Sequence, residues 1–226
     1  MKGIFISATG TDIGKTYISA LVLKQLRQLG VNAGYYKAAQ SGGAADGAED
    51  DASYVARIAA LEEDPSALVS YRYSQAVSPH LAARMENAES PRLSRIVADW
   101  RALAGRHDFM VAEGSGGIVC PLQCDERGVL LLEDVIKALE LDVVLVALCA
   151  LGGINAAVLS VAYMHERGIT PRGIIINRYR QGVMEDDTIA MIERLSGVPV
   201  IARVGEGGGA DAISDTALRV IQGGLP

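Results

Sequence analysis

The chain has 226 residues, half of them hydrophobic, which is enough to bury a core, and we expect residues 1–226 to form one domain. The net charge is −6 and no block of Lys and Arg occurs, which argues against a nucleic-acid partner. Because no apolar run reaches roughly 18–20 residues and no charged leader precedes the first apolar run, we expect neither a membrane partner nor secretion.

Short apolar runs alternate with amphipathic stretches along the chain. The apolar runs predict strands at 3–8, 33–37, 108–113, 143–148, 173–177 and 198–204. Apolar residues at helical spacing predict helices at 16–29, 50–60, 93–104, 131–139, 155–167, 185–195 and 211–222. This alternation predicts an α/β fold with a doubly wound, mostly parallel sheet and helices on both faces.

Four polar, glycine-rich segments follow predicted strands. They are "TGTDIGKT" at 9–16, "AAQSGGAADGAEDD" at 38–51, "GSGG" at 114–117 and "LGGIN" at 151–155. In doubly wound folds ligands bind beyond the carboxyl ends of the strands, so these segments are the candidate binding loops.

The first of these loops departs from the usual phosphate-loop spacing. The pattern G-x-x-x-x-G-K-[ST] requires a glycine at position 9, where Thr9 stands, although Gly14, Lys15 and Thr16 complete its end. The amide groups of a helix N-terminus attract phosphate, a lysine adds positive charge, and the Thr16 hydroxyl can ligate Mg²⁺. A plain helix start capped by the residues just before Gly14 is the alternative.

Acidic residues follow two neighbouring strands. Glu113 ends the run "DFMVAE", where phosphate-loop proteins hold a metal ion, although a solvent-facing carboxylate is the alternative. The acids Glu49, Asp50 and Asp51 follow the second strand and could instead complement a helix dipole. Since Mg²⁺ needs few protein oxygens beside substrate phosphates, these carboxylates become candidates once Thr16 indicates a metal.

Lys37 ends the second predicted strand, and Ser41 follows it in a glycine-rich segment. Among phosphate-site residues, a lysine at this place is a candidate for stabilising transferred charge. A surface lysine is the alternative.

The three cysteines stand at 120, 124 and 149. Cys120 and Cys124 could begin a metal site, but no second pair or nearby histidine completes one. An odd number of cysteines favours reduced thiols in a cytoplasmic protein. Of the histidines, His80 has no assigned role, and we expect His107 and His165 at the surface.

Six segments occur in order between residue 4 and about residue 207: "TGTDIGKT", "GYYKAAQSGG", "VSPH", "VAEGSGGIVCPL", "LGGIN" and "GIIIN". Together they resemble the dethiobiotin synthetase family. The resemblance implies a P-loop NTPase-like mononucleotide-binding fold, a homodimer, and ATP with Mg²⁺. The family joins CO2 to the two amines of 7,8-diaminononanoate through a carbamate and a carbamic-phosphoric anhydride, giving dethiobiotin, ADP and phosphate.

The resemblance also implies roles for individual residues. Lys37 and Lys15 fall on the family's catalytic positions. Mg²⁺ would be bound by Thr16, Asp51 and Glu113. ATP would be bound by Asp12, Ile13, Gly14, Lys15, Thr16, Tyr17, Asp51, Glu113, Gly114, Ser115, Gly116, Asn177, Arg178, Gly205, Glu206 and Gly207. The diamine would be bound by Thr11, Ser41, Gly153, Ile154 and Asn155, the last three across a dimer interface.

Three departures from the family are visible. Asp12 stands where glutamate is frequent, Ala38 replaces a proline after Lys37, and the segment 204–212 is glycine-rich where relatives carry a proline turn. The main alternative function is a nucleotide-driven switch ATPase of the partitioning or nitrogenase-iron-protein type. That class carries a lysine early in its loop, where this chain has Gly10. A longer corrinoid amide-forming synthase is a second alternative.

Overall fold

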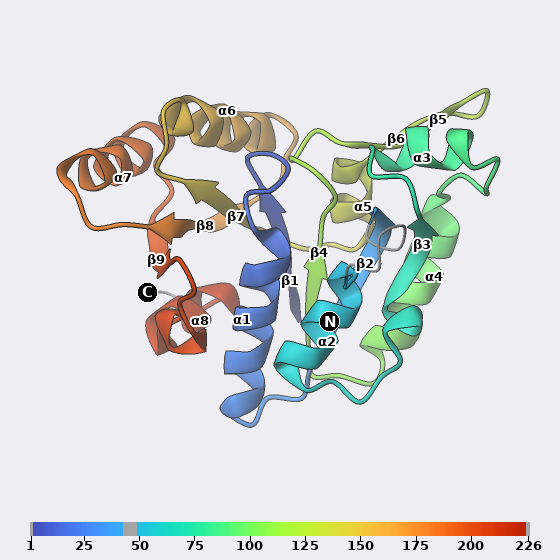
Figure 1. Cartoon of the computed structure of the whole chain (residues 1–226), viewed down its shortest axis with the longest axis horizontal. Helices are drawn as coiled ribbons and strands as arrows, with labels where there is room; N and C mark the ends of the chain where they lie inside the picture. The colour runs from blue at the N-terminus through green and yellow to red at the C-terminus, as the bar shows by residue number, and fades with distance from the viewer. Residues whose placement is uncertain (1, 43–48, 225–226) are drawn as a thin grey trace.

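The computed structural model describes residues 2–42 and 49–224. Seven strands form the central sheet, in the order β3-β2-β4-β1-β7-β8-β9, and every pairing between them is parallel. Their bounds are β1 (Gly3–Ala8), β2 (Ala33–Ser41), β3 (Val69–Tyr73), β4 (Phe109–Glu113), β7 (Val143–Leu148), β8 (Pro171–Tyr179) and β9 (Val200–Gly205). The doubly wound α/β fold expected from the sequence is confirmed (Figure 1).

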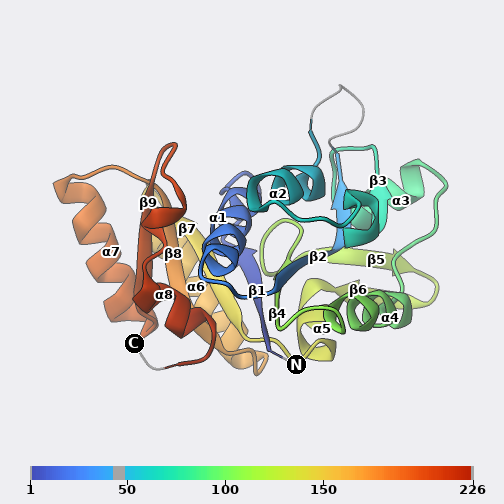
Figure 2. The same ribbon diagram turned by 90° about the horizontal axis from the view of Figure 1, so that it is seen from below.

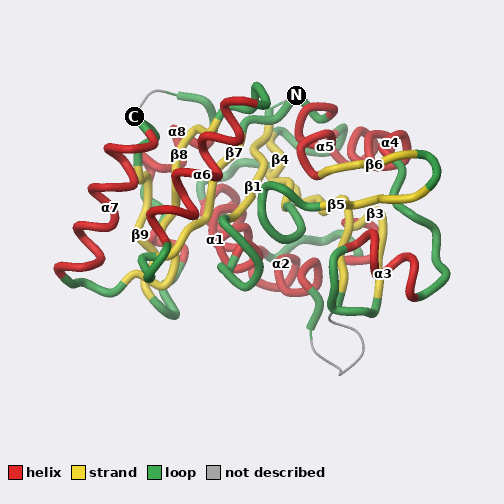
Figure 3. The backbone as a smooth tube through the Cα atoms, turned by 90° about the horizontal axis from the view of Figure 1, so that it is seen from above, coloured by secondary structure: helices red, strands yellow, loops and turns green. Residues whose placement is uncertain are grey.

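Helices cover both faces of the sheet, as Figures 2 and 3 show. On one face lie α1 (Lys15–Gln28) and α2 (Asp51–Ala59). On the other lie α4 (Leu93–Ala104), α5 (Leu132–Ala138) and α6 (Gly153–Glu166), with α7 (Val183–Ser196) beside α6. Two-sided cover explains why the inner strands are apolar almost throughout. Within the described residues, no helix is both long and apolar enough to cross a membrane.

Several short elements escaped the sequence prediction. They are the 3-10 turn η1 (Pro65–Leu68), strand β3, helix α3 (Pro79–Met85) and the antiparallel hairpin of β5 (Pro121–Asp125) and β6 (Gly128–Leu131). The segments of β3, α3 and β5 mix polar with apolar residues, so none of them is a continuous apolar run like the predicted strands. The hairpin forms its own two-stranded sheet beside the main one.

Several predicted boundaries are wrong; β8, for example, spans Pro171–Tyr179 rather than 173–177. The second strand runs to Ser41 rather than ending at Lys37, because β3 pairs with it from Lys37 to Ser41. The helix expected at 211–222 is instead a 3-10 turn η2 (Ala210–Ala212) followed by α8 (Asp215–Ile221). The interruption follows from Ser214, whose hydroxyl accepts a hydrogen bond from the Ala217 amide and so starts a new helix.

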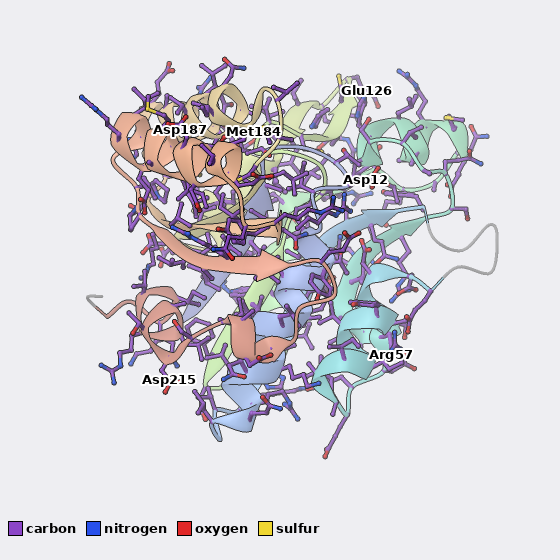
Figure 4. All side chains as sticks on the ribbon, turned by 60° about the vertical axis from the view of Figure 1, so that its left-hand side comes forward. Asp12, Arg57, Glu126, Met184, Asp187 and Asp215 are labelled. Carbon is purple, nitrogen blue, oxygen red and sulfur yellow. The ribbon has the colours of Figure 1, made fainter. Side chains whose placement is uncertain are left out.

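The topology places the candidate loops together. From the central β1 the chain builds β2, β3 and β4 on one side before β7, β8 and β9 on the other, so the winding direction changes at β1 and β7. Ligands bind at such a switch point, beyond the strands' carboxyl ends. The loop after β1 lies toward the top of Figure 1, and Figure 4 shows its Asp12 far from Arg57 and Asp215.

Candidate active site

A cleft of about 940 Å³ opens beyond the carboxyl ends of β1, β2 and β4. It brings together most of the residues singled out in the sequence, from five separate segments. Its lining includes Thr11, Asp12, Gly14, Lys15, Thr16, Tyr17, Lys37, Ser41, Asp51, Glu113, Gly114, Ser115, Gly116 and Arg178. Residues 43–48 of the second loop lie outside the described part of the chain.

Other candidates lie outside this lining. Asn177 packs behind the first loop, where its Nδ2 donates to the Ile13 carbonyl at 2.8 Å. The turn at Gly205, Glu206 and Gly207 is tied to the cleft wall, because the Tyr17 hydroxyl donates to the carbonyl of the neighbouring Gly208. The structure does not bring Gly153, Ile154 and Asn155 to the cleft; they form the first turn of α6.

A compact charge cluster lies at the floor of the cleft. The Lys37 ammonium lies 2.5 Å from Asp51 Oδ2 and 2.6 Å from Glu113 Oε1. Thr16 Oγ1 donates to the same Glu113 oxygen at 2.8 Å. Lys37 and Glu113 are buried and directly opposite each other in the β2–β4 register, so neighbouring strands fix their contact. The alternatives of a surface lysine and a solvent-facing glutamate are therefore wrong.

The pKa of Lys37 follows from this environment. Burial lowers the pKa of its ammonium, but the carboxylates of Glu113 and Asp51 outweigh burial, and the pKa lies above its ordinary value. For Asp51, burial raises the pKa of the carboxyl group, but the charge and hydrogen bond of Lys37 outweigh burial. The pKa of Asp51 therefore lies below its ordinary value. Lys37 is therefore a cation at neutral pH.

Lys15 lies in a different electrostatic environment. Burial lowers its pKa below the ordinary value, and the attraction of Glu113 only partly offsets this, while Lys37 lowers it further. Its ammonium donates to the Gly10 carbonyl at 3.0 Å. An anion in the cleft would supply the charge compensation that this buried lysine lacks.

In the first loop the backbone packs closely against Asn177 and leaves the start of α1 open to a ligand. Gly14 has φ +94° and is the residue from which α1 starts, so neither Thr11 nor Asp12 caps this helix. A side chain at Gly14 would place its Cβ 2.1 Å from Asn177 Nδ2. The first-turn amides of α1 consequently face the cleft without a capping side chain, the arrangement that binds phosphate.

The oxygen atoms around Lys37 suit a magnesium ion. A cation, the Lys37 ammonium, already lies between Asp51 and Glu113, and the Thr16 hydroxyl reaches the same oxygen of Glu113. Over residues 2–42 and 49–224 there is no cluster of three or more His, Cys, Asp or Glu side chains that could hold a metal by themselves. Mg²⁺ commonly takes one or two carboxylates together with substrate phosphates, and this set of side chains fits that demand.

Sequence reasoning missed several residues of this region. Tyr54 and Ala76 line the cleft and carried no signal in the sequence, whereas Val77–Pro79 lie in "VSPH" and Cys120 in "VAEGSGGIVCPL". Burial raises the pKa of Cys120 to about 11, so its thiol stays neutral. The expectation that His107 lies at the surface is wrong: its side chain is 6% exposed and its ring lies between Asn32 and a Glu63 carboxylate 2.8 Å away.

The sequence is similar to those of known proteins. The AAA domain family matches residues 2–207. The ATP-dependent dethiobiotin synthetase BioD of Brachyspira hyodysenteriae is 44% identical over 207 residues, covering 91% of this chain and 93% of that protein. A protein of the same name from Clostridium botulinum is 41% identical over 203 residues, covering 88% of each chain.

The chain belongs to the dethiobiotin synthetase family. Proteins of this name are ATP-dependent ligases of biotin synthesis, and the chain is accordingly a nucleotide-using enzyme of the ligase class. The phosphate-loop cleft lies within the matched region.

Solved structures of cell division proteins share the fold. The MinC:MinD cell division complex of Aquifex aeolicus contains a chain with a TM-score of 0.63 and 14% identity, covering 100% of this chain and 98% of that one. The MinD protein of the same organism, solved alone, has a TM-score of 0.60 and 13% identity to this chain. At these identities the likeness shows the fold alone, so it does not favour a switch ATPase over a dethiobiotin synthetase family enzyme.

The loop geometry predicts that Gly14→Ala weakens nucleotide binding by at least about tenfold, because an L-residue in left-handed backbone costs about 1–2 kcal/mol and the new Cβ meets Asn177. Gly30→Ala is the matched control: Gly30 has φ +80° and open space around its Cβ position. Calorimetric titration with ADP should show weakened binding for Gly14→Ala only. Equal affinities for the two variants would contradict this role for the Gly14–Asn177 contact.

Proposed function

We propose that this enzyme carboxylates 7,8-diaminononanoate and closes the ureido ring of dethiobiotin, using CO2 and magnesium-ATP. The observation that carries the proposal is the meeting of Lys15, Lys37 and Glu113 in one cleft of a dethiobiotin synthetase family member. We also propose that residues 1–226 act as one mononucleotide-binding domain.

The reaction divides into three balanced steps. One substrate amine attacks CO2, which forms a C–N bond and a carbamate as the nitrogen loses a proton. A carbamate oxygen then attacks the γ-phosphorus of ATP, the bond to the β-phosphate oxygen breaks, and ADP leaves. The second amine attacks the carbonyl of this carbamic-phosphoric anhydride, the C–O bond to phosphorus breaks, a proton is lost, and phosphate leaves with the ring closed.

The lysines lower the barrier to these steps by neutralising charge. Carbamate and γ-phosphate are both anions, so their approach costs electrostatic energy unless cations lie between them. Lys37 is buried and positively charged, and Lys15 opens the phosphate-loop helix, so each is placed to touch these oxygens. Thr16, Asp51 and Glu113 would hold Mg²⁺, which supplies charge neutralisation of the β- and γ-phosphates when bound.

The nucleotide would lie along the first loop. Asp12, Ile13, Gly14 and Tyr17 would surround the phosphates with Gly114, Ser115 and Gly116 opposite them. The base would lie near Asn177, Arg178, Gly205, Glu206 and Gly207. Supporting this, Asn177 Oδ1 is buried and has no hydrogen-bond partner within the described residues, so an acceptor is available to an amino group of the base.

The diamine would lie against Thr11 and Ser41, with its carboxylate at the first turn of α6 in a second copy. Gly153, Ile154 and Asn155 do not reach the cleft of their own protomer, which is why a homodimer is part of the proposal. Apolar residues are exposed at the cleft and around α6: Val119 lines the cleft, Leu159 lies on α6, and Leu151 lies just before it. Such a surface suits a partner subunit, and Val119 and Leu159 line a second cavity there of about 500 Å³.

The reaction predicts that phosphate release requires diaminononanoate and bicarbonate together. Mass spectrometry should find dethiobiotin in a one-to-one ratio with ADP. Several nucleoside triphosphates tested in turn would show which base the site accepts. ATP hydrolysis at the same rate without the diamine, and no dethiobiotin, would refute the proposed reaction and favour a switch ATPase.

Substitution of Lys37 tests its catalytic role. We expect Lys37→Ala to reduce turnover by about 10²–10³, because a charge that stabilises the transferring phosphoryl group is lost. ATP binding, measured by calorimetry, should persist through the phosphate loop. Near-normal turnover would remove Lys37 from the catalytic residues. A thermal melt of the variant separates this effect from loss of the buried ion pair with Glu113.

Mixed dimers test whether the site crosses the interface. Asn155→Asp adds negative charge where the substrate carboxylate would bind, so this variant alone should bind the diamine weakly and ATP normally. When Asn155→Asp and Lys37→Ala subunits are mixed, half of the dimers are hybrid and one of their two sites is intact. We expect recovery of about a quarter of the unsubstituted activity. No recovery in dimers shown to be hybrid would place both residues in one protomer's site.

A further inference from the structure

Tyr35 lies beneath the charge cluster and makes a contact that the proposed chemistry does not use. Its side chain is fully buried, and its hydroxyl donates to Glu113 Oε2 at 2.9 Å. The other oxygen of that carboxylate, Oε1, accepts from Lys37 and from Thr16. The two oxygens of Glu113 therefore have different partners: Oε2 is held by a buried hydroxyl, and Oε1 by Lys37 and Thr16, which line the cleft.

We propose that Tyr35 is a positioning residue for the metal-nucleotide centre, holding Glu113 Oε2 so that Oε1 is presented to Mg²⁺. This inference rests on the proposed function, in which Glu113 is a metal ligand. Tyr35 would touch neither the metal nor a substrate and would act through Glu113 alone.

The strand geometry makes this contact specific. Side chains alternate across a strand, so Tyr35 and Lys37 point to the same face of β2, and Lys37 lies opposite Glu113 on β4. Tyr35 is thus the diagonal neighbour of Glu113, within reach of a long side chain. The phenol reaches the far oxygen while Lys37 takes the near one.

A buried carboxylate oxygen that loses its donor costs free energy, because it has given up water without a replacement. Without the Tyr35 hydroxyl, Glu113 would have only the donors on its Oε1 side, and both oxygens would compete for them. Rotation of the carboxylate would then misplace the oxygen meant for the metal. Removing a group that orients a metal ligand in this way typically lowers metal affinity by about 10–100-fold.

Tyr36 provides a matched control in the next position of the same strand. It is also buried, and its hydroxyl bonds Ser70 Oγ at 2.7 Å and the Ile96 carbonyl at 3.0 Å. It points to the opposite face of the sheet, away from Glu113. Tyr35→Phe and Tyr36→Phe each remove one buried hydroxyl from β2, but only the first affects the carboxylate.

The test is a titration of each full-length variant with Mn²⁺ in the presence of ADP, followed by electron paramagnetic resonance. We expect Tyr35→Phe to weaken Mn²⁺ binding by about 10–100-fold, and Tyr36→Phe to leave it within about twofold of the unsubstituted protein. ADP affinity in EDTA should be unchanged in both variants. Unchanged Mn²⁺ affinity in Tyr35→Phe would overturn the positioning role.

Failure of the inference and failure of the proposed function give different results. If the unsubstituted protein binds Mn²⁺ no better with ADP than without, the metal assignment itself is wrong. If Tyr35→Phe does not fold, a crystal structure of the unsubstituted protein with Mg²⁺ and ADP decides instead. That structure should show the Tyr35 hydroxyl on Oε2 and the metal on Oε1, and a Tyr35 hydroxyl detached from Glu113 would overturn the inference.

Discussion

The ion pairs of Lys37 with Glu113 and Asp51 are the constraint on which the rest of the site depends. A lysine this deeply buried is stable as a cation only because two carboxylates lie within hydrogen-bonding distance, and breaking such a pair typically costs about 3–5 kcal/mol. The same carboxylates are the expected metal ligands. If Asp51 and Glu113 hold the metal ion of the nucleotide, the Lys37 ammonium would be available to the substrate anions.

The parallel sheet supplies this cluster from residues far apart in the chain. The β2–β4 register sets Lys37 opposite Glu113, and the start of α2 brings Asp51 to the free side of the ammonium. The first turn of α1 adds Thr16 on the same oxygen of Glu113. Strand pairing and helix starts, both held by the core, therefore bring these charges together.

The sequence predicted the chemistry of this site better than its geometry. Gly14, Lys15 and Thr16 were readable because a phosphate loop is contiguous in the chain, and the strand alternation gave the fold. Lys37 was identified, but at a strand end, because the pairing that extends β2 to Ser41 is with β3, a segment far away in the chain. The Tyr35 contact with Glu113 joins residues 78 positions apart and depends on register, which no local pattern encodes. The α6 first turn, matched by the resemblance, stays outside its own protomer's cleft, a separation that strand and helix spacing could not show.

In the proposed reaction a carbamate oxygen, not water, attacks the γ-phosphorus in the cleft beside Lys37. The most direct measurement is a reaction with ¹⁸O-labelled bicarbonate, started before the label exchanges with water, followed by mass spectrometry of the phosphate released. The account predicts one labelled oxygen transferred to each phosphate, and only when diaminononanoate is present. Phosphate whose new oxygen comes from the solvent would contradict it.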